Sequence, residues 1–315
     1  VLPAFLIAEN LLLNQESTVR ERISGSFGRW RIWLPYAILG AGVLAIRVLV
    51  IGSLTLPHLP DYIDNPLAHV DPFTRILTAV GIFSRYVGLL LFPVDLTVDY
   101  TFNQIPVVTS LFDLHFLVGF VFLAALTTIA YRAANDEVNA LIGLGGLLIL
   151  LAWLPVSNVP FAIGTPMNER LLYLPMIGFC VFVGIGYGRL SEVARGCPPW
   201  IVGLVVCLLF GVRTSIRNAD WQNDFTLFAA AAVSSPNSAK AAFNLGNAYR
   251  DEENYKAALG GYSRALAIYP AYAEVHYNVG VVYQHQQKFK EAVAAYREAT
   301  IHNPNHVGAL LNKGI

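Results

Sequence analysis

Three arginines in the apolar N-terminal part of the chain are the residues best suited to bind a charged ligand. Arg47 lies inside an apolar stretch, Arg85 interrupts another, and Arg170 begins a third directly after Glu169. An arginine within a membrane usually faces a protein interior or a wet cavity and pairs with an anion. Because the guanidinium fork binds phosphate oxygens in a bidentate way, these arginines predict a lipid phosphate as their common ligand. The alternative is snorkelling or structural ion pairs, with carboxylates at Asp64, Asp71, Asp99 or Glu169.

Two polar segments between the apolar stretches hold further candidates. One contains Asp64 and Asn65, and the other contains Asp99 and Tyr100. Aspartate and asparagine near proline commonly shape turns, so both segments also suit a purely structural role. The sequence has no HExxH, GxSxG, P-loop or CxxC pattern, and its seven histidines have no metal-ligand spacing. We therefore expect a site with no metal and no other cofactor.

Long apolar stretches must position these side chains. The sequence is 55% hydrophobic and only 13% charged, which is too apolar for a water-soluble core, so we expect lipid as the solvent. A helix needs roughly 17–25 residues to cross a bilayer. Stretches near that length predict a polytopic transmembrane helical bundle, with helices at 33–56, 112–131, 138–154, 171–190 and 200–216. The stretch 73–92 contains Arg75 and Arg85, and because such charges are costly at the bilayer centre, it predicts an interfacial or re-entrant helix.

Positive charges between these stretches predict which loops face the cytoplasm. Arginines gather before residue 33, at Arg132, and at Arg189 and Arg195, and cytoplasmic loops favour lysine and arginine. These loops share one side of the membrane only if 73–92 does not cross it. The other side, the periplasm of a bacterium or the lumen of the endoplasmic reticulum, then holds residues 57–111, 155–170 and everything after 216.

Three prolines spaced by 34 residues, Pro236, Pro270 and Pro304, organise the C-terminal part. Small and aromatic residues recur in the same register, and this period is the signature of tetratricopeptide (TPR) repeats. We expect an all-α solenoid, preceded by one capping helix over 220–234. The predicted division is a transmembrane domain at 1–216, a half-repeat or capping helix at 217–236, and repeats at 237–315, with units at 237–270, 271–304 and a truncated third from 305.

Asn244, Asn278 and Asn312 recur with the same 34-residue spacing. Stacked repeats would align these amides as a ladder along one face, and each amide offers two donors and an acceptor. Such a ladder could hold an extended peptide backbone without reading its side chains. The alternative, equally compatible with the sequence, is that each amide hydrogen-bonds to a neighbouring helix end.

Several motifs occur in an order that resembles a known family. They are Asp64-Asn65-Pro66-Leu67-Ala68, Arg85-Tyr86, Phe92-Pro93, Asp99-Tyr100, Asn168-Glu169-Arg170, Arg217-Asn218 and Trp221, and TPRs follow them. The combination resembles the transmembrane-and-TPR (TMTC-type) proteins and their bacterial relatives over nearly the whole chain. The short loops and the context of Asp64–Ala68 are more similar to a bacterial relative than to an animal member.

The resemblance implies a GT-C-like membrane glycosyltransferase whose site opens at the non-cytoplasmic face. Eukaryotic members are associated with O-mannosyl transfer from dolichyl-phosphate-mannose to Ser and Thr of secretory proteins. What carries over to this chain is donor-phosphate binding by Glu169 and Arg170, with Arg47 and Arg85 as further candidates. Fixed cations stabilise the charge of a leaving phosphate without a metal.

The resemblance also predicts what this chain lacks. GT-C enzymes place an acidic catalytic residue in their first outer loop. The chain begins inside an apolar run and ends inside a repeat, so we expect a fragment without that loop, inactive alone.

The leading hypothesis is thus part of a membrane glycosyltransferase that uses a polyprenyl-phosphate-linked sugar, such as mannose, and presents acceptor proteins on its TPR arm. The expected partners are acceptor proteins, the lipid-linked sugar and membrane lipids. A formal net charge of +0 provides no basic field for nucleic acid. The alternative is a membrane-anchored TPR scaffold without catalysis, and a third option is a polysaccharide ligase or polymerase.

Overall fold

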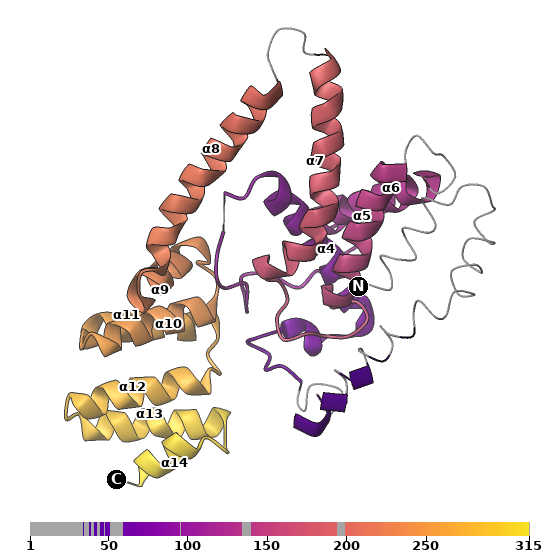
Figure 1. Cartoon of the computed structure of the whole chain (residues 1–315). Coiled ribbons are helices and arrows are strands. Elements are labelled where there is room, and N and C mark those ends of the chain that lie inside the picture. Colours follow the sequence, from indigo (N-terminus) through magenta and orange to yellow (C-terminus); the bar gives the residue numbers. More distant parts are fainter. Residues whose placement is uncertain are drawn as a thin grey trace. The chain divides into compact units, whose positions relative to one another are not determined.

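The computed structural model describes residues 59–94, 96–133, 140–193 and 199–314, together with scattered helical residues between 34 and 50. Within these ranges every regular element is a helix, and none is a strand (Figure 1). The predicted all-α class is confirmed. Arg47 and most of the predicted helix at 33–56 lie outside the described residues.

Two compact units make up the chain, and each combines segments that are distant in the sequence. The first unit contains residues 1–94 and 107–203, and the second contains residues 95–106 and 204–315. Proximity in the sequence suggests that 95–106 belongs with the transmembrane helices on either side of it. Its contacts instead group this short segment with the repeats.

The first unit is built around α4, Pro72–Leu91. Asp71 caps this helix by accepting hydrogen bonds from the backbone N–H groups of Phe73 and Thr74, at 2.9 and 3.1 Å. Hydrogen bonds from the side chain and the backbone of Thr74 hold the pKa of Asp71 below its ordinary value. Every residue from Leu77 to Phe83 is buried, so the middle of α4 is surrounded on all sides.

Three further helices pack in chain order, α5 on α4, α6 on α5, and α7 on α6. They are α5 (Leu114–Ala133), α6 (Ala140–Trp153) and α7 (Tyr173–Val193), and single 3-10 turns occur at η1 (Pro66–Ala68), η3 (Leu154–Val156) and η4 (Glu169–Leu172). Close approach depends on glycine: a Cβ on Gly119 would meet the carbonyl of Val80, and one on Gly178 would meet that of Gly145. The rings of Phe83 and Trp153 meet edge to face at 4.9 Å.

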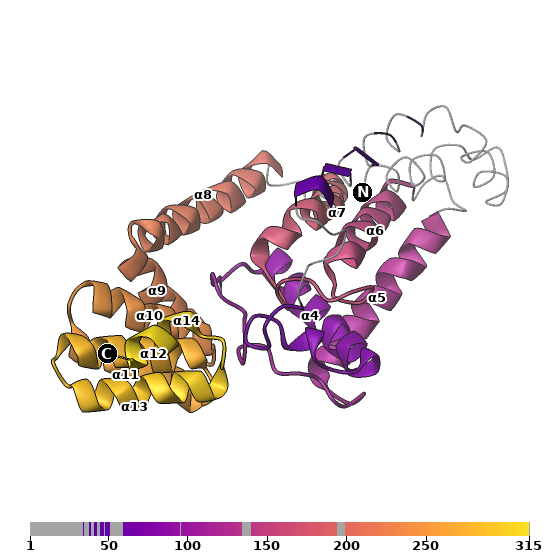
Figure 2. The same ribbon diagram turned by 90° about the horizontal axis from the view of Figure 1, so that it is seen from below.

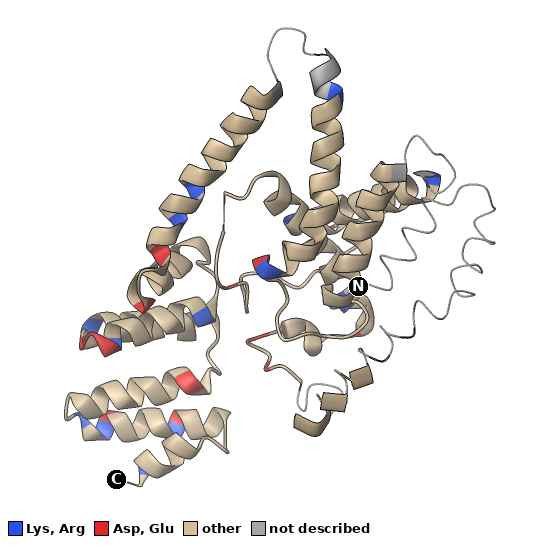
Figure 3. Cartoon of the chain, viewed as in Figure 1, with Lys and Arg blue, Asp and Glu red and all other residues tan. Residues whose placement is uncertain are grey.

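Four described helices are long and apolar enough to cross a membrane: Pro72–Leu91, Leu114–Arg132, Glu169–Arg189 and Trp200–Trp221. The chain is therefore an integral membrane protein, and charged residues are sparse along these helices (Figure 3). The described part of the predicted span at 138–154 is shorter, an apolar helix over Leu141–Val156. The interfacial or re-entrant character of 73–92 stays a prediction, because length and composition also allow this helix to cross.

The second unit begins within α8, Pro199–Asn218, and continues through the turn η5, Ala219–Trp221. The next helix, α9, covers Asp224–Ser234 rather than the predicted 220–234. The difference arises from a capping box, in which Asn223 accepts from the N–H of Thr226 at 2.8 Å and donates its own N–H to the Thr226 hydroxyl. A helix that continued through residue 223 could not form it.

Two helix pairs and the start of a third follow. They are α10 (Ala239–Asp251) with α11 (Tyr255–Ile268), α12 (Ala273–His285) with α13 (Phe289–His302), and α14 (Val307–Lys313). The paired helices run antiparallel, and the pairs lie in chain order (Figures 1 and 2). Equivalent helices begin 34 residues apart, at Ala239, Ala273 and Val307, as the proline spacing predicts.

A buried tyrosine fills the same position in each pair. Tyr262 is fully buried over Gly246, and Tyr296 lies in the same way over Gly280, where a Cβ would stand 2.6 and 2.5 Å from the ring. The hydroxyl of Tyr262 donates to the side chain of Asn247 at 2.8 Å. Burial raises the pKa of Tyr262 to about 12, so this hydroxyl stays protonated and keeps its donor role at physiological pH.

Neighbouring glycines of α11 give a matched test of this packing. A Cβ on Gly261 would meet the backbone of Gly246 at 2.8 Å, whereas one on Gly260 would meet nothing within 4 Å. We expect Gly261→Ala to lower the free energy of unfolding by about 1–3 kcal/mol through overpacking. Gly260→Ala should raise it by about 0.5–1 kcal/mol, because alanine favours a helix interior. Thermal unfolding measures both, and equal effects would contradict the close contact of α10 with α11.

Candidate functional site

A pair of buried asparagines joins two loops of the first unit. Asn65 and Asn158 are both fully buried, and the amide of Asn65 donates to the Oδ1 of Asn158 at 2.9 Å and to the carbonyl of Ile163 at 2.6 Å. The Oδ1 of Asn65 accepts the N–H of Leu67 at 3.1 Å. All of its polar atoms are therefore used within the protein, and Asn65 acts by fixing the loops rather than by facing a ligand.

Asn158 organises the loop that it belongs to. Its amide donates to the carbonyls of Thr165 and Pro166, both at 3.1 Å, and its Oδ1 accepts the N–H of Ile163 at 2.9 Å. Its backbone φ is 63°, in the left-handed region that asparagine tolerates better than most residues. One buried side chain thus closes the loop over residues 158–166.

The same loop is hydrogen-bonded to α4. The hydroxyl of Tyr86 donates to the carbonyl of Asn168 at 3.3 Å and accepts the N–H of Asn168 at 3.0 Å. Tyr86 is buried, so this pair of bonds satisfies its only polar group. Arg85 precedes Tyr86, and Glu169 follows Asn168. These two predicted phosphate-binding residues are therefore each adjacent in sequence to one member of the hydrogen-bonded pair.

The side chain of Arg85 lies near the start of α5. Its Nη2 is 3.3 Å from the Nε2 of His115, and the Nδ1 of His115 is 3.4 Å from the hydroxyl of Ser84. Arg85 is half-buried and also takes part in a further interaction. Since guanidinium only donates, the neutral imidazole of His115 accepts this hydrogen bond at Nε2.

The predicted residues Glu169 and Arg170 open the turn η4, directly before α7. The side chain of Asn168 caps this turn by accepting the N–H of Arg170 at 3.1 Å. Arg170 is exposed and Glu169 is half-buried with a partner of its own. Asp64 is also half-buried and partnered, in the turn that precedes η1.

Two buried donors of the first unit lack an acceptor among the described residues. They are the Nε of Arg75 in α4 and the indole N–H of Trp153 at the end of α6. Buried donors normally have a partner, so each marks a place where an acceptor from outside the described chain would be stabilised.

Asp99 and Tyr100, the candidates from the second polar segment, belong to the second unit. Asp99 is buried, and its Oδ1 accepts both the N–H and the hydroxyl of Thr101, at 2.8 and 2.6 Å. The carboxylate therefore shapes its own loop. Tyr100 is half-buried and has a partner. The structure thus groups Arg85, Glu169 and Arg170 with Asn65 in one unit, and Asp99 with the repeats.

The three asparagines of the proposed ladder have different surroundings. Asn278 is buried; its amide donates to the carbonyl of Glu274 at 2.8 Å, and its Oδ1 accepts from Arg250 of the preceding repeat. Asn312 is half-buried and donates to the hydroxyl of Tyr296 at 3.4 Å. Asn244 is half-buried. At Asn278 the hydrogen bonds favour the structural alternative, a link between adjacent helices.

No group of three or more His, Cys, Asp or Glu side chains within the described ranges is arranged to hold a metal ion. The expected absence of a metal and of another cofactor stays a prediction.

The fold is that of an all-helical membrane protein with repeats at its C-terminal end. Residues 55–127 match the family described as "Protein O-mannosyl-transferase TMTC, DUF1736". Residues 246–287 match "TPR repeat", and residues 273–306 match "Tetratricopeptide repeat". The TPR assignment made from the proline spacing is confirmed.

Named relatives extend this similarity beyond the matched domains. Protein O-mannosyl-transferase TMTC3 of Homo sapiens is 34% identical over 264 residues, which are 78% of this chain and 28% of that protein. Protein O-mannosyl-transferase TMTC1 of Mus musculus is 30% identical over 238 residues, 73% of this chain and 25% of that protein. Protein O-mannosyl-transferase F38B6.6 of Caenorhabditis elegans is 30% identical over 67% of this chain and 30% of its own length.

The resemblance to the TMTC-type proteins is therefore confirmed: this chain combines their DUF1736 domain with TPR repeats, and its curated relatives are TMTC protein O-mannosyl-transferases. The chain spans less than a third of the length of those relatives.

Two residues that shape the site, Asn158 and Tyr86, could not be predicted from the sequence to have this role. Both act through hydrogen bonds to residues more than 80 positions away, Asn158 to Asn65 and Tyr86 to Asn168. The available signal was an asparagine between apolar residues and close to prolines, which suggests a left-handed turn but not its partner.

The buried pair of asparagines predicts an unusual sensitivity to charge. Asn65→Asp would place a carboxylate against two acceptor oxygens, and we expect it to lower the free energy of unfolding by about 3–5 kcal/mol. A protonated carboxyl can donate one hydrogen bond, so its pKa is raised on folding, and the loss should be larger at about pH 8 than at about pH 5. Asp61→Asn, on the exposed side of the same loop, is the control. Thermal unfolding in detergent at both pH values measures the stability of each variant. If both variants lost the same stability at both pH values, the buried contact of Asn65 with two acceptor oxygens would be contradicted.

Proposed function

We propose that the full-length protein containing this chain is a protein O-mannosyl-transferase that takes mannose from a polyprenyl phosphate. The observation that carries the proposal is the TMTC DUF1736 domain at 55–127, which contains Arg85, joined to TPR repeats. The names of the relatives and the GT-C-like architecture that the family implies support the same reaction class.

The chemistry explains why cations are needed. An acceptor hydroxyl attacks C1 of the mannose and loses its proton to a base, while the bond from C1 to the phosphate oxygen breaks. The donor is a phosphodiester with one negative charge, and the released polyprenyl phosphate carries a second. Arginine side chains placed at that oxygen would stabilise the charge as it develops. Arg85 and Arg170, and Arg47 outside the described residues, are our candidates, with Glu169 orienting them. The base is expected in an outer loop outside this chain.

The TPR repeats would present the acceptor protein. TPR arrays have extended surfaces suited to peptides, and half-buried Asn244 and Asn312 remain candidates for contact with a peptide backbone. Asn278 is the weakest of the three, because Arg250 and its own helix already occupy it. The other function open to this architecture, a membrane-anchored scaffold without catalysis, requires the same repeats and no transfer.

Direct transfer tests the proposal. The full-length protein in membranes should move labelled mannose from a polyprenyl phosphate to a Ser/Thr-containing acceptor protein. Arg170→Gln and Arg85→Gln should each lower kcat by roughly 10²–10³-fold, the usual effect of removing one donor to a developing anion. Arg297→Gln, an exposed arginine of α13, is the matched control and should leave kcat unchanged. No transfer by the wild type, with acceptor still bound, would favour the scaffold.

The distribution of arginines between the apolar stretches also predicts on which side of the membrane the TPR repeats lie. We propose that the TPR repeats lie on the non-cytoplasmic side, in the periplasm or the lumen of the endoplasmic reticulum. Protease added to the cytoplasmic face of sealed vesicles should leave residues 224–314 intact and should cut them once detergent is added. Cleavage of the repeats before detergent addition would reverse the topology and, with it, the acceptor-presenting role.

A further inference from the structure

A loop segment, residues 96–106, runs along the beginning of the repeats, within the second unit, and turns at residues 102–104. Its backbone forms two hydrogen bonds there: the N–H of Asn103 donates to the carbonyl of Asn237 at 3.0 Å, and the carbonyl of Phe102 accepts the N–H of Ala239 at 2.9 Å. The N–H of Asn237 donates to the side chain of Gln104 at 3.2 Å. These bonds join residues more than 130 positions apart.

Buried hydroxyls reinforce the backbone contacts. The Ser235 hydroxyl donates to the carbonyl of Asp99 at 2.6 Å and lies 2.8 Å from the hydroxyl of Thr97. The hydroxyls of Thr101 and Ser238 are 3.3 Å apart. All five residues are at least nine-tenths buried, so their polar groups depend on one another for partners.

The receiving surface is the turn between α9 and α10. The N–H of Ser235 closes α9 on the carbonyl of Ala231 at 2.7 Å, and Ser238 caps α10 by accepting the N–H of Ala241 at 3.0 Å. Ala239 is the first residue of α10, where a backbone N–H has no partner within the helix, and the loop carbonyl supplies one. The same loop therefore satisfies a helix end that would otherwise need water.

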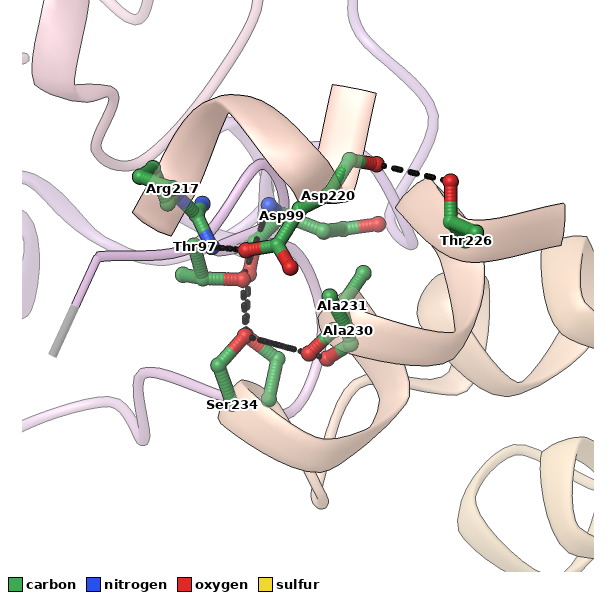
Figure 4. Close-up of polar contacts among 9 residues, drawn as sticks. Thr97, Asp99, Arg217, Asp220, Thr226, Ala230, Ala231 and Ser234 are labelled. Carbon is green, nitrogen blue, oxygen red and sulfur yellow. Dashed lines mark hydrogen bonds and ion pairs between the residues drawn. The ribbon is translucent and has the colours of Figure 1, made fainter. Parts of the chain in front are cut away.

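A ring contact extends the surface to the end of α11. The ring of Phe102 meets that of Tyr269, at the end of α11, edge to face at 5.5 Å. The close-up shows Thr97 and Asp99 together with the end of α9 and with the ion pair of Arg217 and Asp220, which is 2.9 Å long (Figure 4). The loop thus contacts consecutive elements of the second unit rather than one side chain.

We propose that the α9–α10 turn is a docking site for a loop and that residues 96–106 of the same chain fill it. We call this contact the loop–repeat clasp. Because 96–106 lies inside the DUF1736 match at 55–127, the clasp attaches the repeats to the outer loop of that domain at a point far from α8 in the sequence. Ser235 and Ser238 are then positioning residues for residues 96–106, and a role of this contact in binding acceptor proteins rests on the proposed function.

Amide hydrogen exchange on the whole chain in membranes or detergent tests the clasp without any activity. Ser235→Ala should speed the exchange of the Asn103 and Ala239 amides by roughly five-fold, and Ser235→Ala with Ser238→Ala by more, as expected for the loss of neutral hydrogen bonds. Ser234→Ala is the control, because its hydroxyl bonds only to carbonyls of its own helix, Ala230 at 2.9 Å and Ala231 at 3.4 Å. Equal exchange in all variants, or wild-type amides exchanging as fast as an open loop, would overturn the clasp.

A cross-link covers the case in which a serine variant fails to fold. In a background without the native Cys180, Cys197 and Cys207, the pair Thr97→Cys and Ser235→Cys should form a disulfide under mild oxidation, because the two native hydroxyl oxygens are 2.8 Å apart. Thr97→Cys with Ser234→Cys should form far less. Equal formation in both pairs, or none in either, would contradict the clasp.

The positioning role needs a separate readout in the full-length protein. Opening the clasp by Ser235→Ala with Ser238→Ala should raise KM for a folded acceptor protein several-fold, and it should leave transfer to a short Ser/Thr peptide unchanged. Equal loss with both acceptors, or loss with neither, would refute positioning. If the wild type transfers nothing, the proposed function and the positioning role fail together, while the exchange and cross-link results still decide whether the clasp exists.

Discussion

The hydrogen bond between the side chains of Asn65 and Asn158 is the constraint on which the first unit depends. It joins the segment before α4 to the loop before α7, and both amides are fully buried. Leaving one of these buried amides without its partner would cost about 1–3 kcal/mol of folding free energy. This cost favours the arrangement in which the two loops are joined. Tyr86 and Asn168 then continue the connection to Arg85 and Glu169. The residues suited to an anion are therefore held by neighbours that hydrogen-bond within the protein.

The second unit uses the same physical device at another place. Buried hydroxyls and backbone groups of 96–106 and of the α9–α10 turn satisfy each other, as the two asparagines do in the first unit. In a chain this apolar, close packing at glycines such as Gly119 selects some helix arrangements. Buried polar pairs add to this selection, because each group is stabilised only with its own partner. These two loop regions thus derive their shape from polar contacts that are distant in sequence.

Features with a period in the sequence could be predicted, and features that depend on distant pairs could not. The 34-residue spacing gave the repeat helices, since each begins where the spacing places it, and apolar length gave α5, α7 and α8. Asn65 and Asp99 were predicted as candidate site residues, but an asparagine or aspartate near a proline is equally suited to binding a ligand and to shaping a turn. Only the three-dimensional contacts show that Asn65 bonds to Asn158 and Asp99 to Thr101. The capping box at Asn223 also escaped prediction, because this local side-chain bond starts α9 four residues later than the helix pattern indicates.

We propose that the loops of the first unit hold the phosphate of a lipid-linked sugar. The most direct test is photolabelling of the full-length protein in membranes, with a polyprenyl phosphate that carries a photoreactive group beside its phosphate. The account predicts labelled peptides from 78–92 and from 157–172, with labelling that excess polyprenyl phosphate suppresses. Labelling confined to the repeats, or labelling that excess polyprenyl phosphate does not change, would contradict it.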